Sequence, residues 1–197
     1  MSHSGQTTRK TAASADSQQT RLRNRKELRH AAGTVLLIVL AVLVIQRWGF
    51  NISMVRGTSM QPTLQPEQWL FVNKTVPWMG EFGQGDMVIL KEPASVNRGE
   101  HPYLVKRIVA TAGQRVEIAD GRLYIDGKEA VEPYSDARIE DGDFGPLVVA
   151  EGTLFVMGDN RRREGSLDSR FFGSVPEGGL IGRAEWIVWP PSSMSGL

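Results

Sequence analysis

The sequence contains no cysteine. That absence excludes disulfide bonds, thiol nucleophiles and cysteine-ligated zinc. It does not assign a compartment, because a domain of this size can fold without disulfides.

Histidine is almost as scarce. Of the three histidines, His3 and His30 lie in a basic N-terminal stretch, which leaves His101 for any folded domain downstream. His101 sits in "RGEHPY", without apolar support and directly before a proline, so it is a poor candidate for a general base. A multi-histidine metal site has too few ligands. We expect neither a metal nor an organic cofactor.

Net charge is also small, at +1. It gives no indication of a nucleic-acid-binding protein. Residues 1–30 nevertheless carry seven basic and two acidic side chains, a local net charge of +5, and the remainder is therefore at −4. Because residues 1–20 are rich in Ser, Thr, Gln and Ala, we predict that the basic tail 1–30 is largely disordered.

An uncharged apolar run, "AAGTVLLIVLAVLVI", follows at Ala31–Ile45 and extends through "QRWGF" to Phe50. Fifteen helical residues would span ~22 Å and twenty would span ~30 Å, the thickness of a hydrocarbon core. A buried helix lacks the polar face it would need, and a cleavable signal peptide lacks a clear cleavage site. We therefore favour a retained transmembrane anchor over residues 31–50. The basic residues before it predict a cytoplasmic N-terminus.

Residues 51–197 change to short apolar runs separated by turns. Runs typical of strands include "WLFVNK", "DMVILKE", "YLVKRIVA" and "LIGRAEWIVWP", and Asp120-Gly121 and Asp126-Gly127 are turn signals typical of hairpins. The predicted fold class is mainly β, an antiparallel sheet or barrel-like domain preceded by one transmembrane helix. The loop Val76–Gly85 either covers the core or forms an exposed apolar lip at a bilayer.

The stretch "RGTSMQPTL", Arg56–Leu64, places Ser59 beside a proline-bearing turn. A serine nucleophile needs a group that accepts its proton. Without a suitable histidine, lysine is the alternative, and it must lose its charge through burial. In the strand Tyr103–Ala110, Lys106 shares one face with Leu104 and Ile108. Taken alone, the pattern favours a solvated strand lysine.

A second polar stretch, "GDNRRREGSLDSRFFG", spans Gly158–Gly173 after an apolar strand. By composition it is a cluster of turns braced by an Asp–Arg pair. Its acidic residues lack the spacing of a calcium-binding loop.

Four segments in order after the apolar run resemble the conserved boxes of the type I signal peptidases. They are "SMQPTL" (Ser59–Leu64), "GDMVIL" (Gly85–Leu90), "VKRIVATAG" (Val105–Gly113) and "GDNRRREGSLDSRFFG". The resemblance covers approximately Ala31 to Trp189.

The resemblance implies a role for each matching residue. Ser59 would be the nucleophile, Lys106 the general base, and Met60 part of the substrate groove. Ser166 would orient the lysine amine. The last box would form a structural unit that includes Gly158, Asp159, Asn160, Arg161, Asp168, Ser169 and Arg170, with Asp168 and Arg170 as its bracing pair.

The sequence departs from the family pattern at two places. Gly57 stands two residues before Ser59, where some relatives carry a Ser or Thr that donates to the oxyanion, so the Ser59 backbone N–H would have to serve. Arg162–Gly165 also puts four residues between Arg161 and Ser166, where the usual box has two. This expansion either bulges outward or displaces Ser166 from Lys106.

The resemblance implies an enzyme that cleaves signal peptides from exported preproteins after small residues. It also implies that the enzyme is anchored once in the cytoplasmic (inner) membrane, with its β-domain, residues 51–197, on the outer face. Expected partners are preprotein signal peptides and the lipid bilayer, with the secretion translocon as a further candidate, and no nucleic acid. Two alternatives stay open: a maturation peptidase for pilins or conjugation systems with the same chemistry, and a membrane-tethered β-domain that binds a partner without catalysis. A self-cleaving repressor of the LexA type is disfavoured by the anchor.

Overall fold

The computed structural model describes residues 26–44, 47, 49–93 and 103–197. Most of the predicted disordered tail, Trp48 of the predicted anchor and the rejected base His101 lie outside these residues. Contacts divide the chain into two units, Met1–Arg47 and Trp48–Leu197, which we describe separately.

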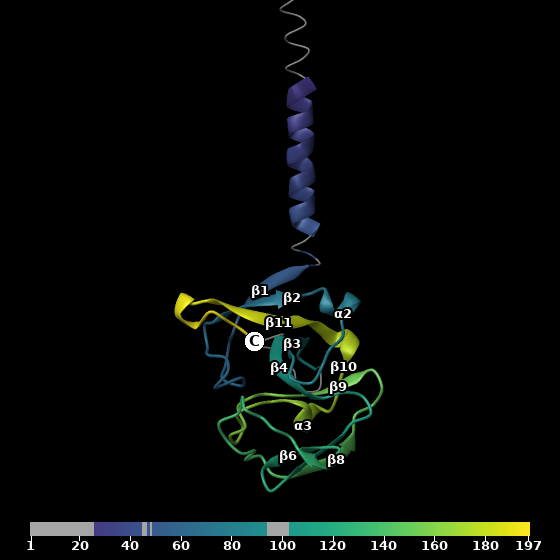
Figure 1. Cartoon of the computed structure of the whole chain (residues 1–197), viewed down its shortest axis with the longest axis vertical. Coiled ribbons are helices and arrows are strands. Elements are labelled where there is room, and N and C mark those ends of the chain that lie inside the picture. The colour runs from purple at the N-terminus through teal and green to yellow at the C-terminus, as the bar shows by residue number, and fades with distance from the viewer. Residues whose placement is uncertain (1–25, 45–46, 48, 94–102) are drawn as a thin grey trace, which may run out of the picture. The chain divides into compact units, whose positions relative to one another are not determined.

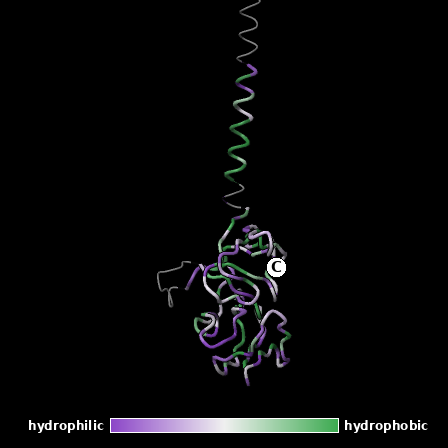
Figure 2. The backbone as a smooth tube through the Cα atoms, turned by 90° about the vertical axis from the view of Figure 1, so that its left-hand side faces the viewer, coloured by the Kyte–Doolittle hydropathy of each residue, from purple (hydrophilic) through white to green (hydrophobic). Residues whose placement is uncertain are grey.

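The described residues of the first unit include the helix Lys26–Val44, with a mean hydropathy of 1.9 over its most apolar window. Figure 2 shows the hydrophobic colouring along most of its length. Its length and composition are sufficient to cross a membrane. The described helix already includes Lys26 to His30, which precede the predicted anchor and are compatible with a helix. Phe50, at the predicted end of the anchor, lies in a strand instead, directly after Gly49 in a turn.

The second unit is mainly β and antiparallel, as predicted. Its larger sheet has eight strands in the order β1-β2-β11-β3-β4-β9-β10, with β12 paired to β11, and its smaller sheet has the order β7-β6-β5-β8 (Figure 1). The larger sheet contains β1 (Phe50–Met54), β2 (Trp69–Asn73), β3 (Met87–Lys91), β4 (Tyr103–Ala110), β9 (Thr153–Met157), β10 (Val175–Pro176), β11 (Leu180–Trp189) and β12 (Ser195–Gly196). The smaller sheet contains β5 (Arg115–Ala119), β6 (Arg122–Ile125), β7 (Lys128–Glu129) and β8 (Phe144–Val148).

Short helices lie between the strands. These are α2 (Val76–Met79) and α3 (Ser169–Phe172), with the single 3-10 turns η1 (Glu177–Gly179) and η2 (Pro191–Ser193). Both predicted Asp-Gly turns are present, and all four of their residues have positive φ, between 51° and 77°. That conformation suits the tight turns that join β5 to β6 and β6 to β7.

Three apolar clusters form the core of this unit. One joins the smaller sheet to β4 and β9, a second lies around β2, β3 and β11, and a third lies around β3, β4, β9 and β10. Strand β4 contributes to all three, because Val109, Val105 and Ile108 each reach a different cluster. The middle of β4 is therefore packed against all three apolar clusters.

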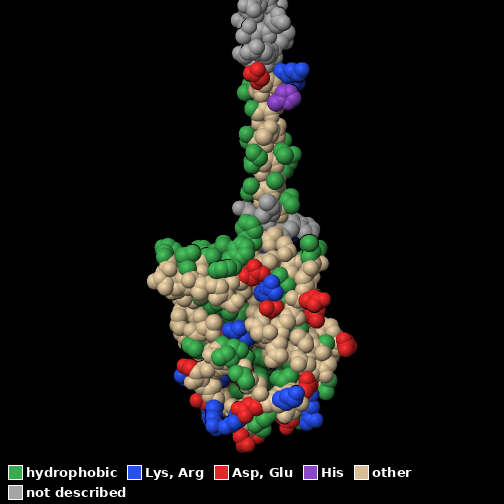
Figure 3. Space-filling model, viewed as in Figure 1, with side chains coloured by type: hydrophobic (Ala, Val, Ile, Leu, Met, Phe, Trp, Pro, Cys, Tyr) green, Lys and Arg blue, Asp and Glu red, His purple; other side chains and the backbone are tan. Residues whose placement is uncertain are grey.

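Large apolar side chains are also exposed along β1, β2 and β11. Trp69, Trp186 and Trp189 are each between 43% and 56% exposed, beside the half-exposed Ile52. Figure 3 shows this apolar surface on one side of the β-domain. In the loop Val76–Gly85, Trp78 is 71% exposed and Met79 is 87% exposed, so part of this loop forms an apolar lip.

Candidate active site

Ser59 lies in the loop that connects β1 to β2. The next residue, Met60, is 2% exposed, and Leu64 is fully buried in the same core cluster. The loop is also closed by a backbone hydrogen bond of 2.8 Å from Leu64 N to Met60 O. Two buried apolar residues thus hold the loop in place, while Ser59 stays half-buried at its surface.

Lys106 lies in the middle of β4 and is only 1% exposed. Its Nζ donates a hydrogen bond of 2.7 Å to the Oγ of Ser59. The structure therefore excludes the solvated lysine that the strand pattern allowed, and it brings together two residues 47 positions apart. This is the geometry expected of a nucleophile and its base.

Burial lowers the pKa of Lys106 from 10.5 to about 8, because the ammonium loses its hydration inside the protein. The carboxylates of Asp168 and Asp159 oppose that change by stabilising the charged form, and Arg170 adds to the lowering. With a pKa near 8, about a tenth of the Lys106 amines are neutral at pH 7. A neutral amine can accept a proton from a serine hydroxyl.

Gly158 allows the last box to approach Ser59 closely. A Cβ on Gly158 would lie 2.3 Å from both the backbone O of Ser59 and the Oγ of Ser166, nearer than real atoms approach. Only glycine fits this position. Next to it, Asn160 N donates to Ser59 O (3.1 Å) and Asn160 Nδ2 donates to Thr58 O (3.2 Å). These bonds fix the backbone that carries the nucleophile.

Buried ion pairs hold the same box in place. The guanidinium of Arg107 makes two hydrogen bonds, of 2.9 and 2.7 Å, to the carboxylate of Asp159, which also accepts from Thr63 Oγ1 at 2.6 Å. Arg161 is fully buried, donates to Gly158 O at 2.7 Å, and pairs with both carboxylate oxygens of Glu132. Such bidentate pairs fix orientation as well as distance.

Asp168 and Arg170 form the predicted bracing pair, with two side-chain hydrogen bonds of 2.8 Å. Asp168 also accepts from Gly158 N at 3.1 Å, and Arg170 donates to Asp141 at 2.8 Å. Ser169 Oγ accepts from Val156 N at 2.9 Å, which joins α3 to β9.

The expanded segment Arg162–Gly165 projects to the surface. Arg162 pairs with Asp136, while the backbone N–H groups of Arg163 and Glu164 donate to Glu140 and Asp141. The outward bulge is therefore stabilised by an acidic loop that precedes β8. Beyond the bulge, Ser166 returns to the interior and is 3% exposed.

Ser166 does not hydrogen-bond to Lys106 in this structure. Its buried Oγ has no hydrogen-bond partner among the described residues. Gly57 adopts a φ of +81°, with open space where a Cβ would be. A side chain at Gly57 is thus disfavoured by backbone conformation rather than by crowding.

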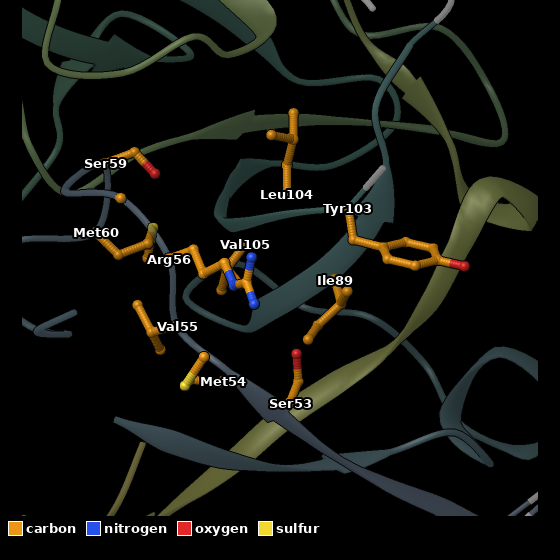
Figure 4. Close-up of a pocket in the computed structure, with 11 residues that line it drawn as sticks. Ser53, Met54, Val55, Arg56, Ser59, Met60, Ile89, Tyr103, Leu104 and Val105 are labelled. Carbon is orange, nitrogen blue, oxygen red and sulfur yellow. The ribbon is translucent and has the colours of Figure 1, made fainter. Parts of the chain in front are cut away.

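A cleft of about 280 Å³ opens beside Ser59 (Figure 4). One wall is formed by the chain from Ser53 to Met60, and the other by Ile89 and the start of β4. Met60, expected in the substrate groove, lines this cleft. Within the described residues no group of three or more His, Asp or Glu side chains is placed to hold a metal ion.

Sequence reasoning missed Glu132, Asp141 and Arg107 as supports of the site. Glu132 and Asp141 lie in loops without a motif. Strand alternation directs Arg107 away from Lys106, but it does not show that Arg107 meets Asp159.

The sequence matches the family described as "Signal peptidase, peptidase S26" over residues 28–189. It is 37% identical over 170 residues to signal peptidase I T of Bacillus subtilis (strain 168), covering 81% of this chain and 84% of that protein. It is 39% identical over 166 residues to signal peptidase I of Bacillus licheniformis, covering 79% of this chain and 86% of that protein.

A crystal structure of a signal peptidase I from Enterococcus faecalis V583 aligns with a TM-score of 0.44 and 29% identity, over 53% of this chain and 97% of its own. The family assignment rests on the sequence matches, and the family model spans residues 28–189, a range that contains Ser59 and Lys106. The chain belongs to the signal peptidase family, peptidase S26.

Proposed function

We propose that this chain is a serine endopeptidase that removes signal peptides from exported preproteins, with Ser59 as nucleophile and Lys106 as general base. The observation that carries the proposal is the 2.7 Å hydrogen bond between Ser59 Oγ and the almost completely buried Lys106 Nζ. A tethered binding module has no need for a buried lysine beside an accessible serine, so this geometry disfavours that alternative.

The first half of the reaction forms an acyl-enzyme. Neutral Lys106 takes the proton of Ser59 as Oγ attacks the carbonyl carbon of the residue before the cut. The resulting ammonium gives that proton to the leaving amine as the peptide bond breaks. In the second half, Lys106 takes a proton from water, the hydroxide attacks the ester, and Ser59 Oγ recovers a proton as the signal peptide leaves.

The negative oxygen formed in each half needs a hydrogen-bond donor. We propose the backbone N–H of Ser59, because Gly57 offers no side chain and no backbone hydrogen bond from Ser59 N is present in the described part of the chain. We assign the orienting role to Ser166. Its buried Oγ lacks a partner among the described residues and lies against Gly158, beside the backbone of Ser59.

The substrate would bind as an extended strand at the edge of the larger sheet. Val55 uses both its backbone groups toward the β2 side, donating to Gln68 O (2.8 Å) and accepting from Glu67 N (3.0 Å). Strand alternation then directs the backbone groups of Met54 and Arg56 toward the cleft. The inner wall of the cleft includes the apolar residues Val55, Met60 and Val105, and small side chains one and three residues before the cut would bind against it.

We further propose that the helix Lys26–Val44 anchors the enzyme once in the cytoplasmic membrane, with a cytoplasmic N-terminus and the β-domain, residues 51–197, on the outer face. The apolar helix and the exposed tryptophans of the β-domain support a bilayer as partner. Confining enzyme and signal peptide to one membrane raises their effective concentration. The secretion translocon, which delivers the substrate, is a further proposed partner.

The direct test uses the purified full chain in detergent with a preprotein that ends its signal peptide in Ala-x-Ala. We expect one cut, directly after the second Ala, identified by N-terminal sequencing of the product. The matched substrate carries Trp in place of that Ala and should not be cut, because a large ring does not fit the cleft. Cleavage of both substrates, or of neither, would contradict the proposal.

The pH dependence follows from Lys106. Because only the neutral amine is a base, kcat/KM should rise about tenfold per pH unit up to the lysine pKa of about 8 and then level off. The measurement is an initial-rate profile from pH 5.5 to 9.5 at constant ionic strength. A plateau that already begins at pH 6 would show that another group accepts the proton.

A further inference from the structure

Arg56 places a cation in a cleft whose other lining residues carry no charge. Its side chain is exposed and lines the cleft together with Val105 of the facing wall (Figure 4). No acidic side chain pairs with Arg56 among the residues that the structure describes, whereas Arg107, Arg161 and Arg170 are all paired. Within the described part of the chain this guanidinium is unpaired, so it is available to a bound ligand.

The position of Arg56 selects one substrate side chain. Val55 is 5% exposed and points into the core, so alternation along the chain puts Arg56 on the outer face of the same wall. In a peptide extended beside this wall, the side chains one and three residues before the cut enter the inner pockets. The side chain two residues before the cut then points outward, on the same face as Arg56.

We propose that Arg56 is a specificity-determining residue that favours substrates with an acidic side chain two residues before the cut and disfavours those with a basic one. This inference rests on the proposed function and deepens it. A carboxylate at that position gains a cross-strand partner, while an ammonium meets a like charge. Because the pair lies at the solvent-exposed surface of the cleft, the preference is modest and sensitive to salt.

The test compares kcat/KM of the full chain in detergent for three preproteins that differ only in Glu, Gln or Lys two residues before the cut. We expect the order Glu, Gln, Lys, with about fivefold between Glu and Lys at 50 mM salt and a smaller ratio at ~1 M salt, where the Debye length is about 3 Å. Arg56→Gln should bring the ratio near one, and Arg56→Glu should invert it.

Ratios within one variant are independent of the amount of active enzyme, so a general loss of activity in the Arg56 variants does not imitate the effect. Arg138→Gln, an exposed arginine outside the cleft, is the matched control and should keep the wild-type ratio. Equal rates for the three substrates in the wild type, or an unchanged ratio in Arg56→Glu, overturn this inference and leave the proposed function standing. A wild-type enzyme that cuts none of the three overturns both.

Discussion

Ser59→Ala should lower kcat for preprotein cleavage by about 10⁴- to 10⁶-fold, since removal of a catalytic serine hydroxyl eliminates the acyl-enzyme route. The measurement is single-turnover cleavage by the full chain in detergent, followed long enough to detect one cut per day. Substrate binding should persist, because the cleft walls do not depend on the Ser59 hydroxyl.

The control for this variant is Ser192→Ala, an exposed serine near the C-terminus, which should retain wild-type rates. Ser59→Ala should stay folded but unfold at a slightly lower temperature than the wild type, because the buried Lys106 amine loses its one described hydrogen-bond partner. If Ser59→Ala keeps more than about a hundredth of the activity, another residue is the nucleophile.

Lys106→Met should be inactive and yet more stable than the wild type. The apolar side chain fills the same volume but offers no base, so we expect a loss of at least about 10³-fold in kcat. The wild type is destabilised because its folded state holds a charged lysine in a buried site at neutral pH. The lowering of the Lys106 pKa from 10.5 to about 8 corresponds to a cost of about 3 kcal/mol in the free energy of unfolding, which Lys106→Met removes. Incomplete packing will reduce the gain to about 1–3 kcal/mol.

The pH dependence of the stability difference between the wild type and Lys106→Met identifies the cause of that difference. Between pH 8 and 10.5 the unfolded lysine binds a proton that the folded lysine has released, so wild-type stability relative to Lys106→Met rises with pH through this window. Below pH 8 the difference is constant. Urea unfolding of both proteins at pH 7 and pH 10 measures it, and a stability difference that does not narrow at pH 10 would contradict the assigned pKa.

Lys106→Arg separates charge from proton transfer. A guanidinium stays protonated, so this variant should be as inactive as Lys106→Met. Unlike Lys106→Met it should be less stable than the wild type, because a larger permanent charge is forced into a fully buried site. Turnover by Lys106→Arg would rule out Lys106 as the base.

The β-domain was predictable in outline because strands and tight turns have local causes. The run Tyr103–Ala110 coincides with β4, and both Asp-Gly turns have the positive φ angles that their residues tolerate. The end of the apolar helix was less accurately predicted. Phe50 is apolar enough for a membrane segment, but it pairs with Asn73 across β1 and β2. No local sequence pattern predicts this pairing.

The supports of the site were not predictable for the same reason. Arg161 appears in a polar run that resembles a surface turn, and yet it is fully buried against Glu132. The four-residue expansion before Ser166 allowed two outcomes. The partners that direct it outward, Asp136 and Glu140, lie in a separate loop.

The amino-acid sequence by itself determined the apolar N-terminal helix and the mainly β domain. The lack of cysteine and of a usable histidine directed attention to lysine, and the resemblance to the type I signal peptidases singled out Ser59 and Lys106. Only the tertiary structure decided that Lys106 is buried beside Ser59. The pKa of Lys106 depends on the burial of its amine and on the charges of Asp168, Asp159 and Arg170, which lie near it through long-range packing rather than as neighbours in the chain.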